Sequence, residues 1–142
     1  MPLMFLNGTA MSGQKHHSAH KGSTFLGPAS TAARYRFFAI RDQFPGLYPV
    51  ASGGRVIEGE LYDIPDAVLH DHLLPAEPPE LMFGRIELLD GDEVNAMLLV
   101  PSRIAPNVRV VDISELGGFR AYLRFLAANA AVLTTLTVDP VP

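Results

Sequence analysis

Short apolar segments, each closed by glycine or proline, run through the whole chain and limit its fold most strongly. The 142 residues contain twelve glycines and twelve prolines, which are spread along the sequence rather than gathered in one linker. Because glycine and proline interrupt helices and mark turns, the segments between them are expected to be short strands or short helices. The pattern predicts one domain of the all-β or α+β class, since a chain of this length builds one core rather than two.

The clearest local prediction is a β-hairpin at Asp90-Gly91, where two alternating apolar runs meet a dipeptide typical of tight turns. This hairpin should pair residues 81–89 with residues 94–100. Three further strands are expected from clustered or alternating apolar residues, over 3–6, 33–40 and 55–64. Pro45-Gly46 is interpreted as the end of the connection after the second of these strands.

Two helices are expected. Pro65 suits the first turn of a short helix over residues 65–74. Near the C-terminus a stripe of apolar residues at helical spacing predicts a second helix lying across the strands, with Asp112 or Ser114 available as its N-cap (Leu116, Phe119, Leu123, Leu126). The domain should span residues 1–131, and residues 132–142 are expected to form an edge strand or a tail.

Composition excludes several classes of function. The chain has no cysteine, which excludes disulfides, zinc–thiolate sites and thiol nucleophiles. Its formal charge of −4 and its dispersed basic residues argue against binding to nucleic-acid phosphates. No apolar run is long enough to span a membrane, and no nucleotide-binding loop or nucleophilic serine motif is present, so we expect a soluble cytoplasmic protein without a cofactor.

Three groups of residues are candidates for chemistry. The turn after the first strand, Asn7-Gly8-Thr9-Ala10, can expose backbone N–H groups that hold a carboxylate. Glu77 lies in the loop Pro75-Ala76-Glu77-Pro78-Pro79-Glu80, where prolines would fix a carboxyl beside a strand. If Glu77 is desolvated, its pKa rises and it can move a proton to or from nitrogen near pH 7.

The third group is the histidine-containing segment Lys15-His16-His17-Ser18-Ala19-His20. His16 and His20 resemble metal ligands only in their spacing, and the neighbouring lysine and serine do not complete a site, so no metal is expected. An imidazole from this segment, His17 in particular, could contact a substrate or shuttle a proton. The alternative, a surface histidine without a role, remains open.

The order of several motifs resembles the γ-glutamylcyclotransferase-like superfamily. These motifs are Asn7-Gly8-Thr9-Ala10-Met11, Gly13, His16-His17, Phe25-Leu26-Gly27, Pro45-Gly46-Leu47-Tyr48-Pro49 and Gly59-Glu60-Leu61-Tyr62-Asp63-Ile64-Pro65. Three others are similar to the C-terminal domain of allophanate hydrolase, here as a stand-alone copy. They are the segments 33–39, 84–91 and 112–123, of which the last is the most specific.

The resemblance implies an α+β fold: a small mixed β-barrel with a cavity, one short helix and one C-terminal helix. It also implies an anion-holding loop at residues 7–10 and, in cyclotransferases, a glutamate that acts as general acid and base. Glu77 corresponds best to that glutamate, although Glu80 is close enough to compete. The usual tyrosine and leucine of the first motif are Asn7 and Ala10 here, which alters the floor of the pocket.

Three classes of function therefore remain. The first is a small-molecule enzyme that acts on a carboxylate-bearing amide or carbamate, of γ-glutamyl or allophanate type, with Glu77 as the catalytic acid and base. The second is a non-catalytic module that binds a small ligand or accompanies a separately encoded amidase. The third is a structural or oligomer-forming barrel without a ligand, whose cavity is filled by its own side chains. The expected partners are a small-molecule substrate and such an amidase, self-association into a homo-oligomer is left open, and neither nucleic acid nor membrane is expected.

Overall fold

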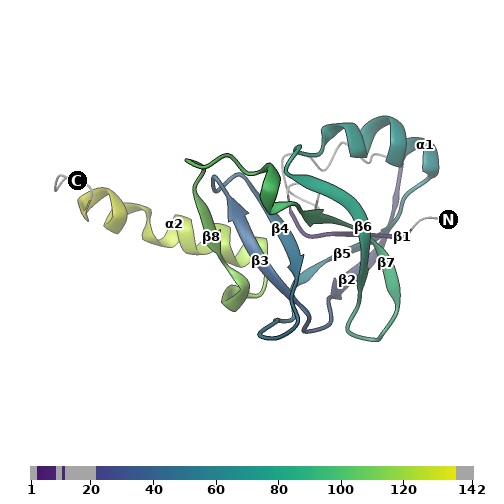
Figure 1. Cartoon of the computed structure of the whole chain (residues 1–142), viewed down its shortest axis with the longest axis horizontal. Coiled ribbons are helices and arrows are strands. Elements are labelled where there is room, and N and C mark those ends of the chain that lie inside the picture. The colour runs from purple at the N-terminus through teal and green to yellow at the C-terminus, as the bar shows by residue number, and fades with distance from the viewer. Residues whose placement is uncertain (1–2, 9–10, 12–21, 137–142) are drawn as a thin grey trace.

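One strongly curled sheet of eight strands forms the body of the protein (Figure 1). The computed structural model describes residues 3–8, 11 and 22–136. The strands are β1 (Leu3–Leu6), β2 (Thr24–Ser30), β3 (Tyr35–Ile40), β4 (Phe44–Pro49), β5 (Glu58–Asp63), β6 (Leu81–Glu87), β7 (Glu93–Leu99) and β8 (Val110–Asp112). Their order across the sheet is β2-β5-β1-β7-β4-β3-β8, and β6 pairs with β7 off this path.

The sheet is mixed, as the α+β expectation requires. β1 pairs β5 in antiparallel fashion but β7 in parallel, and β4 is likewise parallel to β7. The curled sheet and two helical regions confirm the fold class expected from the sequence. Among the described helices, none combines the length and apolar character that crossing a bilayer would need.

The β6–β7 hairpin confirms the strongest local prediction. Its seven residue pairs run from Leu81 opposite Leu99 to Glu87 opposite Glu93. At the turn Gly91 has a φ of 93°, a conformation that glycine adopts without strain. The side chain of Asp90 also accepts a hydrogen bond from the backbone N–H of Asp92 at 3.0 Å, so both residues of the dipeptide contribute to the turn.

Strand β4 contradicts the expectation that Pro45-Gly46 ends a connection, because both residues lie inside the strand. Gly46 packs so closely on β7 that a Cβ there would lie 2.9 Å from the Cβ of Leu99. The glycine therefore serves a close approach of two strands rather than a turn. Strands β2 and β8 were also not predicted, since β2 is mostly exposed and interrupted by a bulge, and β8 has only three residues.

The helices differ from the sequence expectation in their ends. The short helix appears as α1 (Asp66–Val68), followed by a π-helical turn, η2 (Leu69–Leu73), and a 3₁₀ turn, η3 (Leu74–Ala76). The C-terminal helix α2 (Phe119–Leu136) begins after Gly118, so neither Asp112 nor Ser114 is its cap. Residues 132–136 are helical rather than an edge strand, because the alanine-rich turns before them carry the helix onward.

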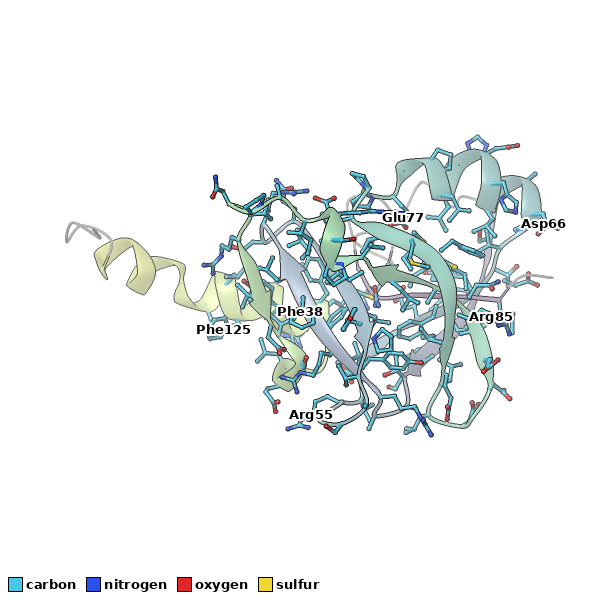
Figure 2. All side chains as sticks on the ribbon, in the orientation of Figure 1. Phe38, Arg55, Asp66, Glu77, Arg85 and Phe125 are labelled. Atoms are coloured by element: carbon cyan, nitrogen blue, oxygen red, sulfur yellow. The ribbon has the colours of Figure 1, made fainter. Side chains whose placement is uncertain are left out.

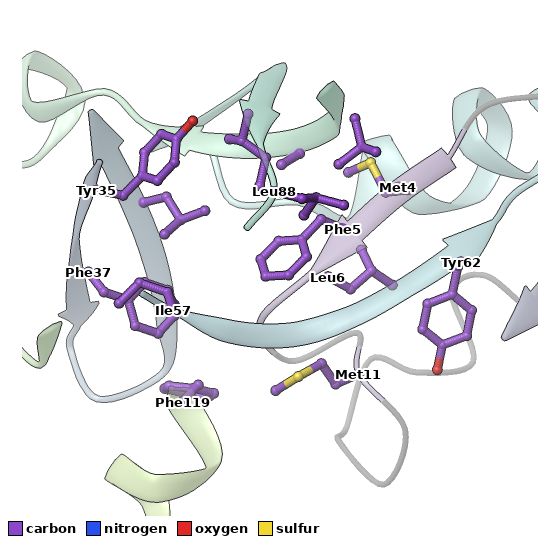
Figure 3. Close-up of a cluster of buried hydrophobic side chains, with 14 of the residues drawn as sticks. Met4, Phe5, Leu6, Met11, Tyr35, Phe37, Ile57, Tyr62, Leu88 and Phe119 are labelled. Atoms are coloured by element: carbon purple, nitrogen blue, oxygen red, sulfur yellow. The ribbon is translucent and has the colours of Figure 1, made fainter. Parts of the chain in front are cut away.

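The core lies inside the curl of the sheet (Figure 3). Phe5, Phe37, Ile57 and Phe119 are all less than 2% exposed and come from distant parts of the chain. Among the described side chains of α2, Phe119 and Tyr122 are buried in this core, and Leu123 and Leu126 pack against it. The rest of α2 extends away from the sheet instead of lying across it (Figure 1).

Candidate functional site

The turn after β1 is held by the core on one side and by β4 on the other. Met4, Phe5 and Leu6 are buried and anchor the strand that leads into it. A Cβ on Gly8 would lie 2.6 Å from Cδ of Pro45, so only glycine fits at this point. The backbone N–H of Met11 donates to the carbonyl of Gly8 at 3.1 Å and closes the turn.

The loop that carries Glu77 is fixed by turns on both sides. Its N–H donates to the carbonyl of Leu74 at 3.1 Å, which ends the 3₁₀ turn η3. Pro78 follows and restricts Glu77 to the extended conformation that it has, with φ −76° and ψ 145°. The N–H of Leu81, the first residue of β6, then donates to the carbonyl of Pro78 at 3.1 Å. Figure 2 shows Glu77 beside the start of that strand.

Glu77 and the Asn7-Gly8 turn line one cleft, which we call the Glu77 cleft. Its other walls are mainly apolar and come from β1, β4, β6 and β7 (Phe5, Leu6, Phe44, Pro45, Leu81, Met97). The open space in it is about 20 Å³, room for about one water molecule. Two segments that are 70 residues apart in the sequence are thus brought together in one cleft.

Burial in this apolar cleft raises the pKa of Glu77 from 4.5 to about 7. The cause is desolvation, which disfavours the charged form of a carboxyl group. Near neutral pH the side chain therefore exists in both protonation states and can both accept and donate a proton.

Glu80 has a different environment, which separates the two glutamates that competed at the sequence level. Its carboxylate is 6% exposed and lies 2.7 Å from the guanidinium of Arg41. Desolvation alone would raise the pKa of Glu80, but hydrogen bonds from Arg41 and its own backbone, with the charge of Arg41, leave it below its ordinary value. Glu80 stays ionised and paired, and it does not line the Glu77 cleft.

Several predicted site residues lie outside the described part of the chain: Thr9, Ala10, His17, and also His16 and His20. Of the substrate-binding set, the structure places Asn7 and Gly8 in the cleft. The described residues contain no group of three or more side chains that could hold a metal ion.

Sequence reasoning missed the apolar walls of the cleft and the role of Arg41. Phe44 and Pro45 were assigned to a connection, so no signal placed them opposite Glu77. Arg41 has a φ of 53° in the tight turn between β3 and β4. The sequence did not reveal this backbone conformation, from which the guanidinium of Arg41 reaches the carboxylate of Glu80. Its guanidinium also lies over the ring of Phe44, 5.4 Å from the ring centre.

Comparison with known proteins places this geometry in context. The family model of the allophanate hydrolase C-terminal domain matches residues 2–124. A urea amidolyase of Saccharomyces cerevisiae is 31% identical over 109 residues, which is 73% of this chain but only 6% of that protein. The chain thus spans a small part of the curated relatives that it matches.

Two solved structures extend the comparison. The uropathogenic E. coli-specific protein c4763 superposes with a TM-score of 0.78 at 34% identity, over 86% of this chain and 94% of that one. An AIG2-like protein of Mus musculus superposes with a TM-score of 0.56 at 21% identity, over 75% of this chain and 80% of that one. The second likeness concerns the fold alone, and it confirms the γ-glutamylcyclotransferase-like architecture that the motifs resembled.

Proposed function

The chain belongs to the allophanate hydrolase C-terminal domain family, and from this premise we propose that it is a small-molecule enzyme acting on a carboxylate-bearing amide or carbamate. The observation that carries the proposal is the Glu77 cleft. It combines a carboxyl group whose pKa is about 7 with the backbone turn at Asn7-Gly8. Neither a metal nor a nucleotide is required by this chemistry.

Each part of the cleft has a role in the proposal. Backbone N–H groups of the turn that starts at Asn7 and Gly8 bind the substrate carboxylate, because a turn of this kind concentrates amide dipoles on an anion. Thr9, Ala10 and His17 complete the substrate-binding set. Apolar walls exclude water around Glu77 and keep its proton affinity near neutrality.

Glu77 moves the proton in either of two reactions. With a γ-glutamyl amide, it takes a proton from the attacking α-amine and returns it to the leaving nitrogen as the new C–N bond forms and the old one breaks. With a carboxylated carbamate, it delivers a proton to the nitrogen as the N–C bond breaks and carbon dioxide leaves. In the first reaction the carboxyl acts as base and then as acid, and in the second it acts as acid and regains its proton from solvent; a pKa near 7 permits both.

The open space in the cleft is smaller than either substrate, so binding has to widen the cleft. The turn at residues 7–8 and the loop at Glu77 are the segments that would have to separate. A separately encoded amidase is proposed as the source of a carbamate substrate, because urea amidolyases hold a domain of this family within a much longer chain.

The test is an NMR time course of the purified protein with γ-glutamyl amines, γ-glutamyl amides and allophanate, repeated with Glu77→Gln. The matched control is Glu93→Gln, which removes an exposed carboxylate at the start of β7. Turnover should fall about 100-fold or more in Glu77→Gln, the usual size of general acid–base catalysis, and stay unchanged in Glu93→Gln. Equal turnover in the two variants would refute the role of Glu77, and ligand binding without turnover of any substrate would refute the enzyme.

A further inference from the structure

A second cavity lies between β2, β5 and the start of α2, and we call it the α2 cavity. Its volume is about 210 Å³, ten times the open space of the Glu77 cleft. The two share no lining residue within the described part of the chain. Figure 3 shows two of its lining residues, Met11 and Phe119 at the first turn of α2, both on the same side of β5.

Two arginines of α2 line this cavity, and their charges are compensated differently. Arg120 and Arg124 lie one turn apart on the same face of the helix. Arg120 is tied to the buried carboxylate of Glu60 at 3.1 Å, which also accepts a hydrogen bond from the hydroxyl of Tyr62 at 3.0 Å. Arg120 is therefore a fixed part of the wall, and its positive charge is compensated by the carboxylate of Glu60.

Arg124 forms no ion pair with any of the residues that the structure describes. Its guanidinium carries five N–H donors in a planar fork that matches a carboxylate. A cation that lines a cavity and lacks an internal counter-charge is suited to an anionic ligand.

A carboxylate lines the same cavity at the beginning of the helix. Glu58 is held there because its backbone N–H donates to the carbonyl of Gly117 at 2.6 Å. Its Oε2 would lie 3.6 Å from a Cβ placed on Gly118, so the carboxylate lies against the first turn of α2. The positive end of the helix is thus already compensated, and Glu58 remains available as a hydrogen-bond acceptor toward the cavity.

The two charged groups that line the cavity define the ligand. Glu58 lies beside Gly118, and Arg124 is six residues further on, a backbone rise of about 9 Å along the helix axis, so both side chains border one cavity of about 210 Å³. We propose that the α2 cavity binds a small acid that carries N–H donors at its other end, such as an amino acid or a ureido acid. Its carboxylate pairs with Arg124 and its N–H groups donate to Glu58. The volume fits a ligand smaller than the usual drug-sized molecule.

The test is an NMR titration of the full chain with N-carbamoylglycine and with glycine, monitored through the backbone amides. Both compounds should shift the amides of residues 58–59 and 118–124. Acetate and urea, which each supply one half of the ligand, should bind more weakly. Arg124→Gln should weaken binding of N-carbamoylglycine about tenfold or more, and Arg124→Lys, which keeps the charge but not the fork, should lie between.

Control variants separate this proposal from the function proposed above. Glu77→Gln should leave ligand binding in the α2 cavity unchanged. The binding proposal would therefore stand even if the catalytic role of Glu77 were refuted. Glu58→Gln should weaken glycine more than acetate, because only glycine offers an N–H group to the carboxylate. Wild-type affinity in Arg124→Gln, or shifts confined to residues 5–8 and 77–81, would overturn the proposal, as would the absence of any shift at millimolar ligand.

Discussion

Replacing Glu77 with glutamine should stabilise the folded protein, although it should lower the proposed activity about 100-fold or more. A carboxyl group in an apolar cleft is held there at a cost whenever it is ionised. Glutamine has nearly the same shape and carries no charge, so it removes this cost. Most substitutions at half-buried positions destabilise a protein, whereas this one should stabilise it.

The magnitude and its pH window follow from the raised pKa. The folded-state pKa of about 7 lies above the ordinary value of 4.5, so between these values the folded state holds a proton that the unfolded state has lost. The free energy of unfolding of the wild type therefore falls as pH rises from 4.5 to 7, and it levels off above 7. The total loss is at most about 3.5 kcal/mol, because one pKa unit is worth about 1.4 kcal/mol.

Urea denaturation of the wild type and of Glu77→Gln across pH 4 to 9 measures this directly, as an order-of-magnitude comparison. The two proteins should be about equally stable near pH 4, and the variant should be more stable by up to about 3.5 kcal/mol above pH 7. A ¹³C titration of the Glu77 carboxyl should give a midpoint near 7. A stability difference that does not change with pH would show that the carboxyl is solvated, and the argument for the cleft would then fail.

Three further substitutions test an ion pair, a buried hydrogen bond and a close backbone contact elsewhere in the fold. Glu80→Gln should lower the free energy of unfolding by about 1–2 kcal/mol at pH 7, measured by urea denaturation. The loss is smaller than for breaking a fully buried ion pair, because the side chain of Arg41 is 37% exposed. Since the pKa of Glu80 is lowered, the difference between variant and wild type should disappear as the pH falls below 4.5. Ser114→Ala should cost about 2 kcal/mol and lower the Tm, because the buried N–H of Phe37 loses its acceptor at 2.7 Å. Gly59→Ala should destabilise more than either and reduce soluble yield, since its Cβ would lie 2.5 Å from a backbone carbonyl of β1.

Local sequence signals predicted those parts of the fold in which the paired residues lie close together in the sequence. The β6–β7 hairpin needs only the turn Asp90-Gly91 and two alternating runs, and its register follows from them. The parallel contacts of β7 with β1 and β4 join segments tens of residues apart, and periodicity carries no information about them. The same limit explains why β4 was not predicted. Pro45 and Gly46 are residues typical of turns, but Gly46 lies in a strand because it packs closely against Leu99 of β7.

The sequence allowed the two candidate segments of the site to be named, but it did not predict which residues surround them. Prolines around Glu77 indicated a fixed carboxyl, and the glycine after Asn7 indicated a tight turn. That these two segments line one cleft depends on the sheet order, which brings β1, β4 and β6 together. The distinction between Glu77 and Glu80 depends on Arg41, whose left-handed backbone no sequence pattern revealed.

The first part of the C-terminal motif, residues 112–117, positions the start of α2 without lining the α2 cavity. Arg36 of β3 donates twice to Oδ2 of Asp112, at 2.7 and 3.1 Å. Oδ1 of Asp112 accepts from the hydroxyl of Ser114 at 2.6 Å, and that hydroxyl accepts from the N–H of Phe37. These bonds attach the chain to β3 immediately before it turns.

Gly117 then reverses the chain, because its φ of 81° ends the 3₁₀ turn η5 (Ser114–Leu116). The helix α2 therefore starts at a defined point, with Phe119 in the core and Arg120 against Glu60. It follows that Ser114→Ala, if its cost is confined to this attachment, should weaken N-carbamoylglycine binding together with stability, while the raised pKa of Glu77 stays at about 7. A variant that lost stability but bound the ligand as the wild type does would show that the start of α2 is set by its own packing and not by the motif.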